Sequence, residues 1–116
     1  MQIFFTSGTT GAPKMVPQTM EYARWLSVAG KYWLDLTPDD VHWNIADTGW
    51  AKSAWSSVFA PWTQGAGVFV HGMRRFTGGE VLRVLSERPM ITTLCAPPTL
   101  YREEQKISWA RSQLQK

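Results

Sequence analysis

The sequence contains a single cysteine, Cys95, and no long apolar run. One cysteine excludes an internal disulfide and any metal site built from several cysteines. Because no stretch of about eighteen apolar residues is present, no membrane span is expected. The chain has twelve Lys and Arg against nine Asp and Glu, and the basic residues are scattered, with Arg74-Arg75 as their only local cluster. We therefore expect neither a nucleic-acid partner nor a disordered chain.

The chain start also lacks the features of a targeting segment. Met1–Phe5 has no basic stretch, is too short for the apolar part of a signal peptide, and is followed by no small-residue cleavage pattern. The location of the protein is therefore left open by the sequence. With 116 residues, 44% of them hydrophobic and 18% charged, the chain has the size and composition of one globular domain.

Hydrophobic spacing predicts strands that alternate with helices. The expected strands are Ile3–Phe5, Val41–Ala46, Val68–Val70 and Ile91–Cys95. The expected helices are Val16–Leu34, Trp50–Trp62 and a segment that begins at a Thr77–Glu80 capping box and ends near Pro89. Such alternation is typical of right-handed crossovers. We therefore predict an α/β fold with a partial, mainly parallel sheet and flanking helices.

The segment Thr6–Lys14 carries the clearest chemical signal. It places four hydroxyl side chains, two glycines and a lysine within nine residues, between a predicted strand and a predicted helix. Glycine lets backbone N–H groups approach phosphate oxygens, hydroxyls add donors, and a lysine adds full positive charge. The predicted polyphosphate-binding residues are Thr6, Ser7, Gly8, Thr9, Thr10, Gly11, Ala12, Pro13 and Lys14.

The composition of this loop also fits two other interpretations. The P-loop of nucleoside triphosphatases needs four residues between its glycines and a Ser or Thr after its lysine. Here two residues separate Gly8 from Gly11, and Met15 follows Lys14, so this class is excluded. A flexible Ser/Thr/Gly turn without a ligand stays open as the alternative. The position at the end of a strand favours ligand binding.

The loop closely resembles the phosphate loop of the adenylate-forming superfamily. Further segments resemble successive landmarks of the medium-chain acyl-CoA synthetases: Phe5–Met15, Trp43–Trp50, Pro61-Trp62, Val68–His71 and Ala96–Arg102. The resemblance covers residues 2–102. Met15 stands where most relatives with other substrates have glycine, which favours the medium-chain branch.

This resemblance implies a two-step ligation with ATP, Mg²⁺ and coenzyme A. A carboxylate attacks the α-phosphate of ATP to give acyl-AMP and pyrophosphate, and the thiol of coenzyme A then displaces AMP. Thr6–Lys14 is expected to hold the β- and γ-phosphates, with Lys14 stabilising negative charge on the departing pyrophosphate. The magnesium ligand is expected outside this chain. The family also implies a mitochondrial matrix location.

Several other residues were assigned roles. Trp50 is expected in the acid pocket, by the same resemblance, and packing is its alternative role. Four further tryptophans are expected in the core: Trp25, Trp33, Trp55 and Trp62. His42 and His71 lack neighbours at metal-ligand spacing, so we expect strand or strand-end residues and no zinc site. Cys95 has no visible activating base, and we expect a buried thiol.

The resemblance ends at Arg102. We therefore expect a partial AMP-binding domain over residues 1–102 and a divergent tail over residues 103–116. The family's aromatic-Gly-x-Thr-Glu segment, ribose-binding aspartate, hinge and C-terminal catalytic lysine have no counterpart in the sequence. Three interpretations stay open: an active synthetase, an inactive shortened product, and a module that pairs with a full-length partner through open sheet edges. We favour the second.

Overall fold

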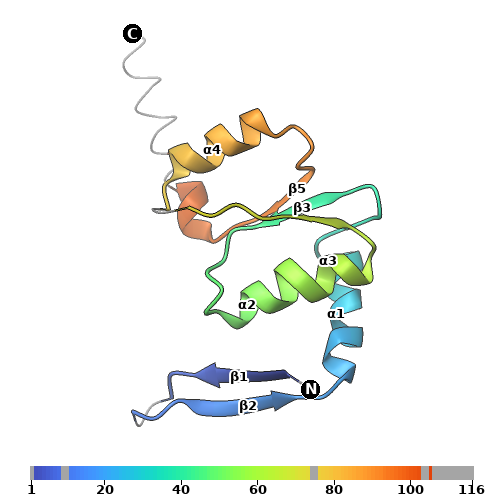
Figure 1. The fold of residues 1–116 in the computed structure, drawn as a ribbon, viewed down its shortest axis with the longest axis vertical. Coiled ribbons are helices and arrows are strands. Elements are labelled where there is room, and N and C mark those ends of the chain that lie inside the picture. The colour runs from blue at the N-terminus through green and yellow to red at the C-terminus, as the bar shows by residue number, and fades with distance from the viewer. Residues whose placement is uncertain (1, 9–10, 74–75, 103–104, 106–116) are drawn as a thin grey trace.

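The computed structural model describes residues 2–8, 11–73, 76–102 and 105, and it combines a hairpin, a helical layer and a small sheet (Figure 1). In chain order the elements are β1 (Gln2–Thr6), β2 (Lys14–Gln18), α1 (Glu21–Tyr32), β3 (Val41–Asn44), α2 (Ala51–Ala54), the π-helical turn η1 (Trp55–Phe59), α3 (Ala60–Thr63), β4 (Gly67–Phe69), α4 (Gly78–Glu87) and β5 (Thr93–Cys95). None of the helices within these ranges has the length and apolar character needed to cross a bilayer.

Strands β1 and β2 form an antiparallel hairpin, with Gln2 opposite Gln18 and Thr6 opposite Lys14. The prediction of a strand, a loop and then a helix from Val16 is therefore wrong. Pro17 lacks a backbone N–H and disfavours helical angles at the residue before it, so Val16 stays extended. The helix begins only at Glu21.

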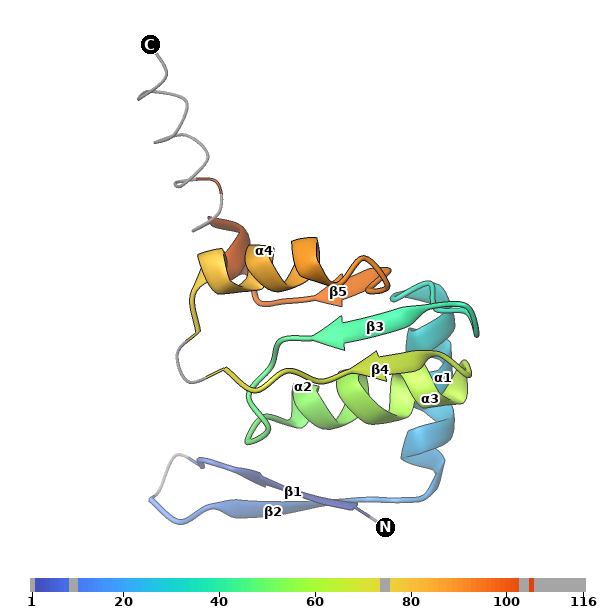
Figure 2. The ribbon, with the colours of Figure 1, turned by 45° about the horizontal axis from the view of Figure 1, so that its top comes forward.

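Strands β3, β4 and β5 form a parallel sheet in the order β4-β3-β5, which confirms the α/β fold. The predicted first strand is not part of this sheet, because β1 pairs only with β2. Helix α4 lies on one face of the sheet, and the continuous helical segment α2–η1–α3 lies on the other (Figure 2). A central strand covered on both faces explains why adjacent residues His42 and Trp43 are both buried.

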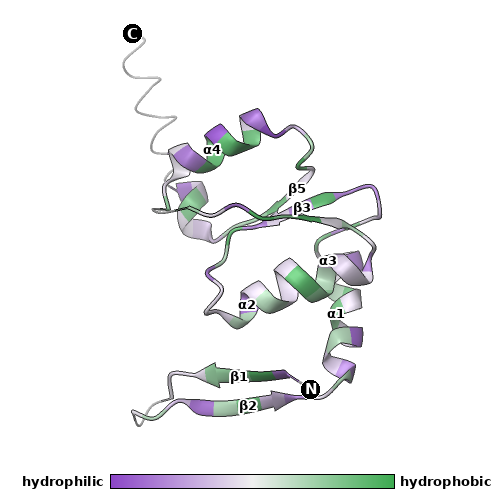
Figure 3. Ribbon diagram, viewed as in Figure 1, coloured by the Kyte–Doolittle hydropathy of each residue, from purple (hydrophilic) through white to green (hydrophobic). Residues whose placement is uncertain are grey.

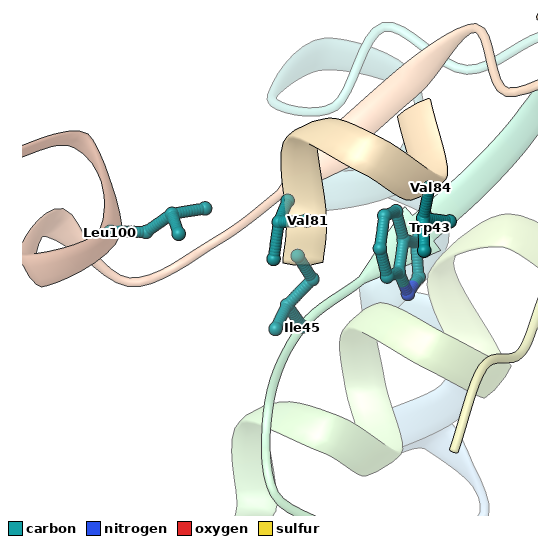
Figure 4. Packing of buried hydrophobic residues seen from close by; sticks show 5 residues of the cluster. All are labelled: Trp43, Ile45, Val81, Val84 and Leu100. Atoms are coloured by element: carbon teal, nitrogen blue, oxygen red, sulfur yellow. The ribbon is translucent and has the colours of Figure 1, made fainter. Parts of the chain in front are cut away.

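The core lies between the sheet and α4. Its buried residues are Trp43, Ile45, Val81, Val84 and Leu100, drawn as sticks in Figure 4. The predicted start of α4 is confirmed by its cap, because the Thr77 hydroxyl accepts a hydrogen bond from the backbone N–H of Glu80 at 3.3 Å. This cap holds the first turn of α4, which carries Val81 into the core.

The assignment of three tryptophans to the core is wrong. Trp25, Trp33 and Trp62 are 72%, 78% and 66% exposed, while Trp55 is half-buried. Helix α1 instead packs on α3 through Gly30, and this contact leaves no room for a side chain between the two helices. Strand β1 is also strongly hydrophobic (Figure 3), although Phe5 is 65% exposed. Apolar spacing indicated that these elements exist but did not identify their buried side.

Candidate functional site

The predicted phosphate loop is the turn of the β1–β2 hairpin. Thr9 and Thr10 lie outside the described residues. Gly8 has a φ of 60° and Gly11 a φ of 91°, a backbone region that favours glycine. A β-carbon at Gly8 would also lie 2.9 Å from the carbonyl oxygen of Ala12. The turn therefore requires glycine at position 8 for both its angles and its tight closure.

Lys14 is the first residue of β2 and lies opposite Thr6 at the base of this turn. Both side chains are exposed. The loop is followed by a strand and not by the predicted helix, so no helix N-terminus adds positive charge to it. The positive charge at the loop comes from Lys14.

Three aromatic rings connect the hairpin to the helices. The Phe4 ring meets Tyr22 of α1 edge to face at a centroid distance of 5.8 Å, and Tyr22 meets Phe59 of η1 at 6.4 Å. Burial raises the pKa of the Tyr22 hydroxyl, which is consistent with a packed position. The hairpin is thereby held against α1 and η1.

A cleft lies at the carboxyl ends of the parallel strands, where open α/β sheets bind ligands. We call it the carboxyl-edge cleft. Its larger hollow, of about 500 Å³, is lined by Trp43, Asn44, Ile45, Ala46, Asp47, Thr48, His71, Met73, Phe76, Pro97 and Thr99. A smaller one of about 370 Å³, the Trp50 hollow, is lined by Ile45, Ala46, Asp47, Trp50, Lys52 and Pro97. The four residues they share make them branches of one cleft.

Trp50 is positioned by a tight turn after β3. The Asp47 carboxylate accepts a hydrogen bond from the Gly49 N–H at 2.7 Å, and the Trp50 N–H donates to the Asp47 carbonyl oxygen at 3.0 Å. The Trp50 backbone is extended and immediately precedes α2. Its indole is 72% exposed and borders the Trp50 hollow, so the turn supplies one wall of the cleft.

In both ribbon views, the end of β1 and the start of β2 lie on the same side of the molecule as the carboxyl ends of the parallel strands, where the cleft is (Figures 1 and 2). The sequence predicted Ile3–Phe5 as a strand of the mainly parallel sheet, which is wrong, because the hairpin forms a sheet of its own. The arrangement nevertheless directs the candidate phosphate loop and the candidate acid pocket to one side.

A polar layer fixes β3 against η1 behind the cleft. His42 Nδ1 lies 2.8 Å from the Thr93 hydroxyl and His42 Nε2 lies 3.4 Å from the Ser56 hydroxyl, while the Asn44 amide donates to Ser57 at 2.8 Å. Burial lowers the pKa of His42, and the nearby Asp40 carboxylate only partly opposes this. His42 is thus a strand residue with a structural role.

His71 follows β4 and lines the larger hollow. Its ring stacks on Phe69 at 6.3 Å, and its Nε2 lies 3.5 Å from the Glu80 carboxylate. The hydrogen bond from Arg83 is the main cause of the lowered pKa of Glu80. Within the described ranges, no three His, Cys, Asp or Glu side chains gather in a way that could hold a metal ion. Cys95 is half-buried in β5.

Sequence reasoning did not identify Lys52 or His71 as residues of the cleft. His71 was expected as a strand or strand-end residue without a binding role, although a place directly after a β-strand is a signal for the sheet edge. Lys52 follows Trp50 by two positions, and nothing in the spacing separates a residue of the cleft from an ordinary charged residue on the helix surface.

Comparisons with known proteins agree with the family resemblance and the fold. Residues 1–114 match a family model described as AMP-binding enzyme. The chain is 59% identical to human acyl-coenzyme A synthetase ACSM3, mitochondrial, over 103 residues, which are 88% of this chain and 17% of that protein. The chain thus spans less than a fifth of this curated relative.

Two solved structures show the same local fold. Brucella canis acyl-CoA synthetase superposes with a TM-score of 0.72 and 32% identity, covering 87% of this chain and 18% of that one. O-succinylbenzoate coenzyme A synthetase from Bacillus subtilis, solved in complex with AMP, gives a TM-score of 0.56 and 33% identity, covering 73% of this chain and 22% of that one.

Proposed function

The chain belongs to the AMP-binding enzyme family, and from this we propose that residues 2–102 form the phosphate loop and part of the acid pocket of an AMP-forming acyl-CoA synthetase. The observation that carries the proposal is the hairpin turn. Gly8 closes it at a positive φ, and Lys14 stands exposed at its base opposite Thr6. This combination suits a polyphosphate, which needs closely approaching backbone donors and a fixed positive charge.

Lys14 and the loop act on the phosphates of ATP in this proposal. The loop N–H groups hold the β- and γ-phosphates, and the Lys14 ammonium stabilises the charge that builds on pyrophosphate as it leaves. Neither the loop nor Lys14 forms a covalent bond with the substrate or transfers a proton to or from it. The acyl-transfer step to coenzyme A involves no pyrophosphate, so the loop has no direct role in it.

The proposed acid substrate is a medium-chain carboxylic acid. Most of the wall of the Trp50 hollow is apolar, formed by Ile45, Ala46, Pro97 and the Trp50 indole. An alkyl or aryl chain against this wall is removed from water, which stabilises the complex by about 25 cal/mol for each Å² buried. The name of the human relative supports acyl-CoA synthesis as the reaction.

ATP with Mg²⁺ and coenzyme A are the proposed co-substrates. We assign no residue of this chain to Mg²⁺, because the described part gathers no set of carboxylate or imidazole ligands. We also propose a mitochondrial location, which the name of the human relative supports. The proposal also includes a partial AMP-binding domain that ends at Arg102. It further includes the expectation that the 116-residue chain alone has no ligase activity.

A chimera tests this function. Residues 2–102 replace the matching stretch of human acyl-coenzyme A synthetase ACSM3, with which they share most residues. We expect the chimera to exchange pyrophosphate into ATP in the presence of hexanoate and to form hexanoyl-CoA, and the 116-residue chain alone to do neither. A folded chimera without exchange activity overturns the proposal, as long as the unaltered human enzyme is active in the same assay.

A further inference from the structure

Lys52 is the one basic residue of the Trp50 hollow, in the described part of the chain. Its side chain is half-buried, and its ammonium makes no ion pair with any described residue. Asp47 borders the same hollow, but its carboxylate accepts the Gly49 N–H and forms no ion pair with Lys52. The hollow is therefore lined by a lysine whose positive charge is not paired with any described carboxylate.

The remaining wall of this hollow offers the cation little compensation. Ile45, Ala46 and Pro97 are apolar, and the Trp50 indole provides an aromatic surface. Removing an ammonium from water is unfavourable unless an opposite charge or a hydrogen-bond acceptor replaces the lost hydration. A small anion with an apolar body can pair its charge with Lys52 and place its apolar part against the rest of the wall.

We propose that Lys52 binds the carboxylate of an organic acid whose apolar part lies against Trp50 and Pro97. This inference rests on the proposed function for its substrate class and adds the residue that recognises the acid. Lys52 acts in binding: its ammonium donates charge-assisted hydrogen bonds to the carboxylate oxygens before the acid reacts. No bond is made or broken at Lys52.

Lys52 also borders a second hollow, of about 520 Å³, which includes Trp33, His42 and Tyr101. We assign the acid to the Trp50 hollow because that one opens at the carboxyl ends of the parallel strands. In the second hollow, the two ring nitrogens of His42 already have hydroxyl partners. Substitutions at Trp50 and Trp33 distinguish the two places.

The first test titrates the full 116-residue chain with hexanoate by calorimetry. Lys52→Met keeps the length and apolar stem of the side chain and removes its charge, so hexanoate affinity is expected to fall about ten- to a hundred-fold. Lys52→Arg is expected to retain most of the affinity. Lys31→Met is the matched control, since Lys31 lies over the Tyr32 ring and not in the cleft, and should change nothing.

The second test measures the same substitution in the chimera. Lys52→Met is expected to raise the KM for hexanoate about ten-fold or more while kcat and the KM for ATP stay within two-fold. The reason is that Lys52 contacts the carboxylate when the acid binds, before the chemical step. Decanoate and benzoate should show the same rise, since the carboxylate is common to all three acids. A lowered kcat at unchanged KM contradicts a binding role.

The outcomes separate this inference from the function on which it rests. If Lys52→Met leaves hexanoate affinity and KM unchanged while Trp50→Ala weakens them, the hollow holds the acid and Lys52 does not contact it. If only Trp33→Ala weakens binding, the acid lies in the second hollow and the inference is wrong. If the chimera is inactive, the proposed function fails, and the titration of the full chain still decides the role of Lys52: no hexanoate binding there overturns it.

Discussion

Gly30 of α1 lies directly against the backbone of Ala60, the first residue of α3. A β-carbon at Gly30 would be 2.6 Å from the Ala60 carbonyl oxygen and 3.0 Å from Cγ of Gln64. Gln64 also donates a side-chain hydrogen bond to the Ser27 carbonyl of α1 at 3.0 Å. The two helices are therefore in contact at a distance that only glycine permits.

Gly30→Ala should destabilise the chain. Alanine is favoured over glycine in a helix by about 1 kcal/mol, but the clash is with backbone and forces the helices apart, at a typical cost of 1 to 3 kcal/mol. We expect a net loss of about 1 kcal/mol in the free energy of unfolding, measured in urea. Gly79→Ala in α4 is the control. Position 79 has nothing within 4 Å of an added β-carbon, so that variant should gain stability.

Leu100→Ala should be strongly destabilising. Leu100 is 2% exposed and packs in the core cluster beneath α4, so truncation leaves a cavity and costs about 2 to 5 kcal/mol. Leu82→Ala is the matched comparison, because Leu82 is 44% exposed, and it should cost about 1 kcal/mol or less. Equal losses in urea unfolding would show that the core does not lie where the structure places it.

Stability should fall as the pH is lowered from 7 to 5. Burial holds the pKa of His42 below its ordinary value of about 6.5, so the unfolded chain takes up a proton first on acidification. The stabilisation is complete above the unfolded pKa and is lost as the pH falls toward the folded pKa. The limiting slope for one group is about 1.4 kcal/mol per pH unit.

His42→Gln should flatten this pH dependence, because glutamine does not titrate and still offers polar atoms near Thr93 and Ser56. Urea titrations of both variants at pH 7, 6 and 5 measure the slope. The pH range stays above the region where Asp40 titrates, since hydrogen bonds from Thr92 and Thr37 lower its pKa. An unchanged slope in the variant would assign the pH dependence to other groups.

Lys14→Ala in the chimera should slow adenylation about ten- to two-hundred-fold. The variant loses one charge-assisted contact to phosphate, typically worth about 1.5 to 3 kcal/mol. Lys14→Arg should restore only part of the rate, because a planar guanidinium replaces a compact ammonium. The second half-reaction, from acyl-AMP and coenzyme A, should keep its rate. Equal slowing of both steps would point to a structural role for Lys14 instead.

Sequence reasoning predicted most of the fold from hydrophobic spacing. Val41–Ala46 and Ile91–Cys95 each contain a strand of the parallel sheet, Val68–Val70 overlaps another, and the Thr77 cap marked the start of α4. These signals are local, since apolar residues recur along each element and one residue caps the helix. Such local signals do not depend on contacts between elements that are distant in the sequence.

The errors arose where pairing or packing between distant residues decides the structure. The apolar positions after Val16 fit helical spacing, but pairing with β1 and the backbone limits at Pro17 keep this stretch extended. The exposure of Trp25 follows from the approach of Gly30 to Ala60, and nothing in the spacing indicates it. The residue types of the loop identify it in the sequence. The place of Lys52 in the cleft follows only from the three-dimensional structure.

The two sheets also differ in the order in which they can form. The β1–β2 hairpin joins strands separated by a short turn, and such hairpins close within about 1 to 10 microseconds. Strand β3 pairs with β4 and β5 much later in the sequence, so these pairings bear the entropy of closing long loops. During synthesis the N-terminal hairpin can therefore form while β3 still lacks its β5 partner. The edge of β3 that faces β5 then stays unpaired until Cys95 has emerged, and unpaired strand edges favour aggregation.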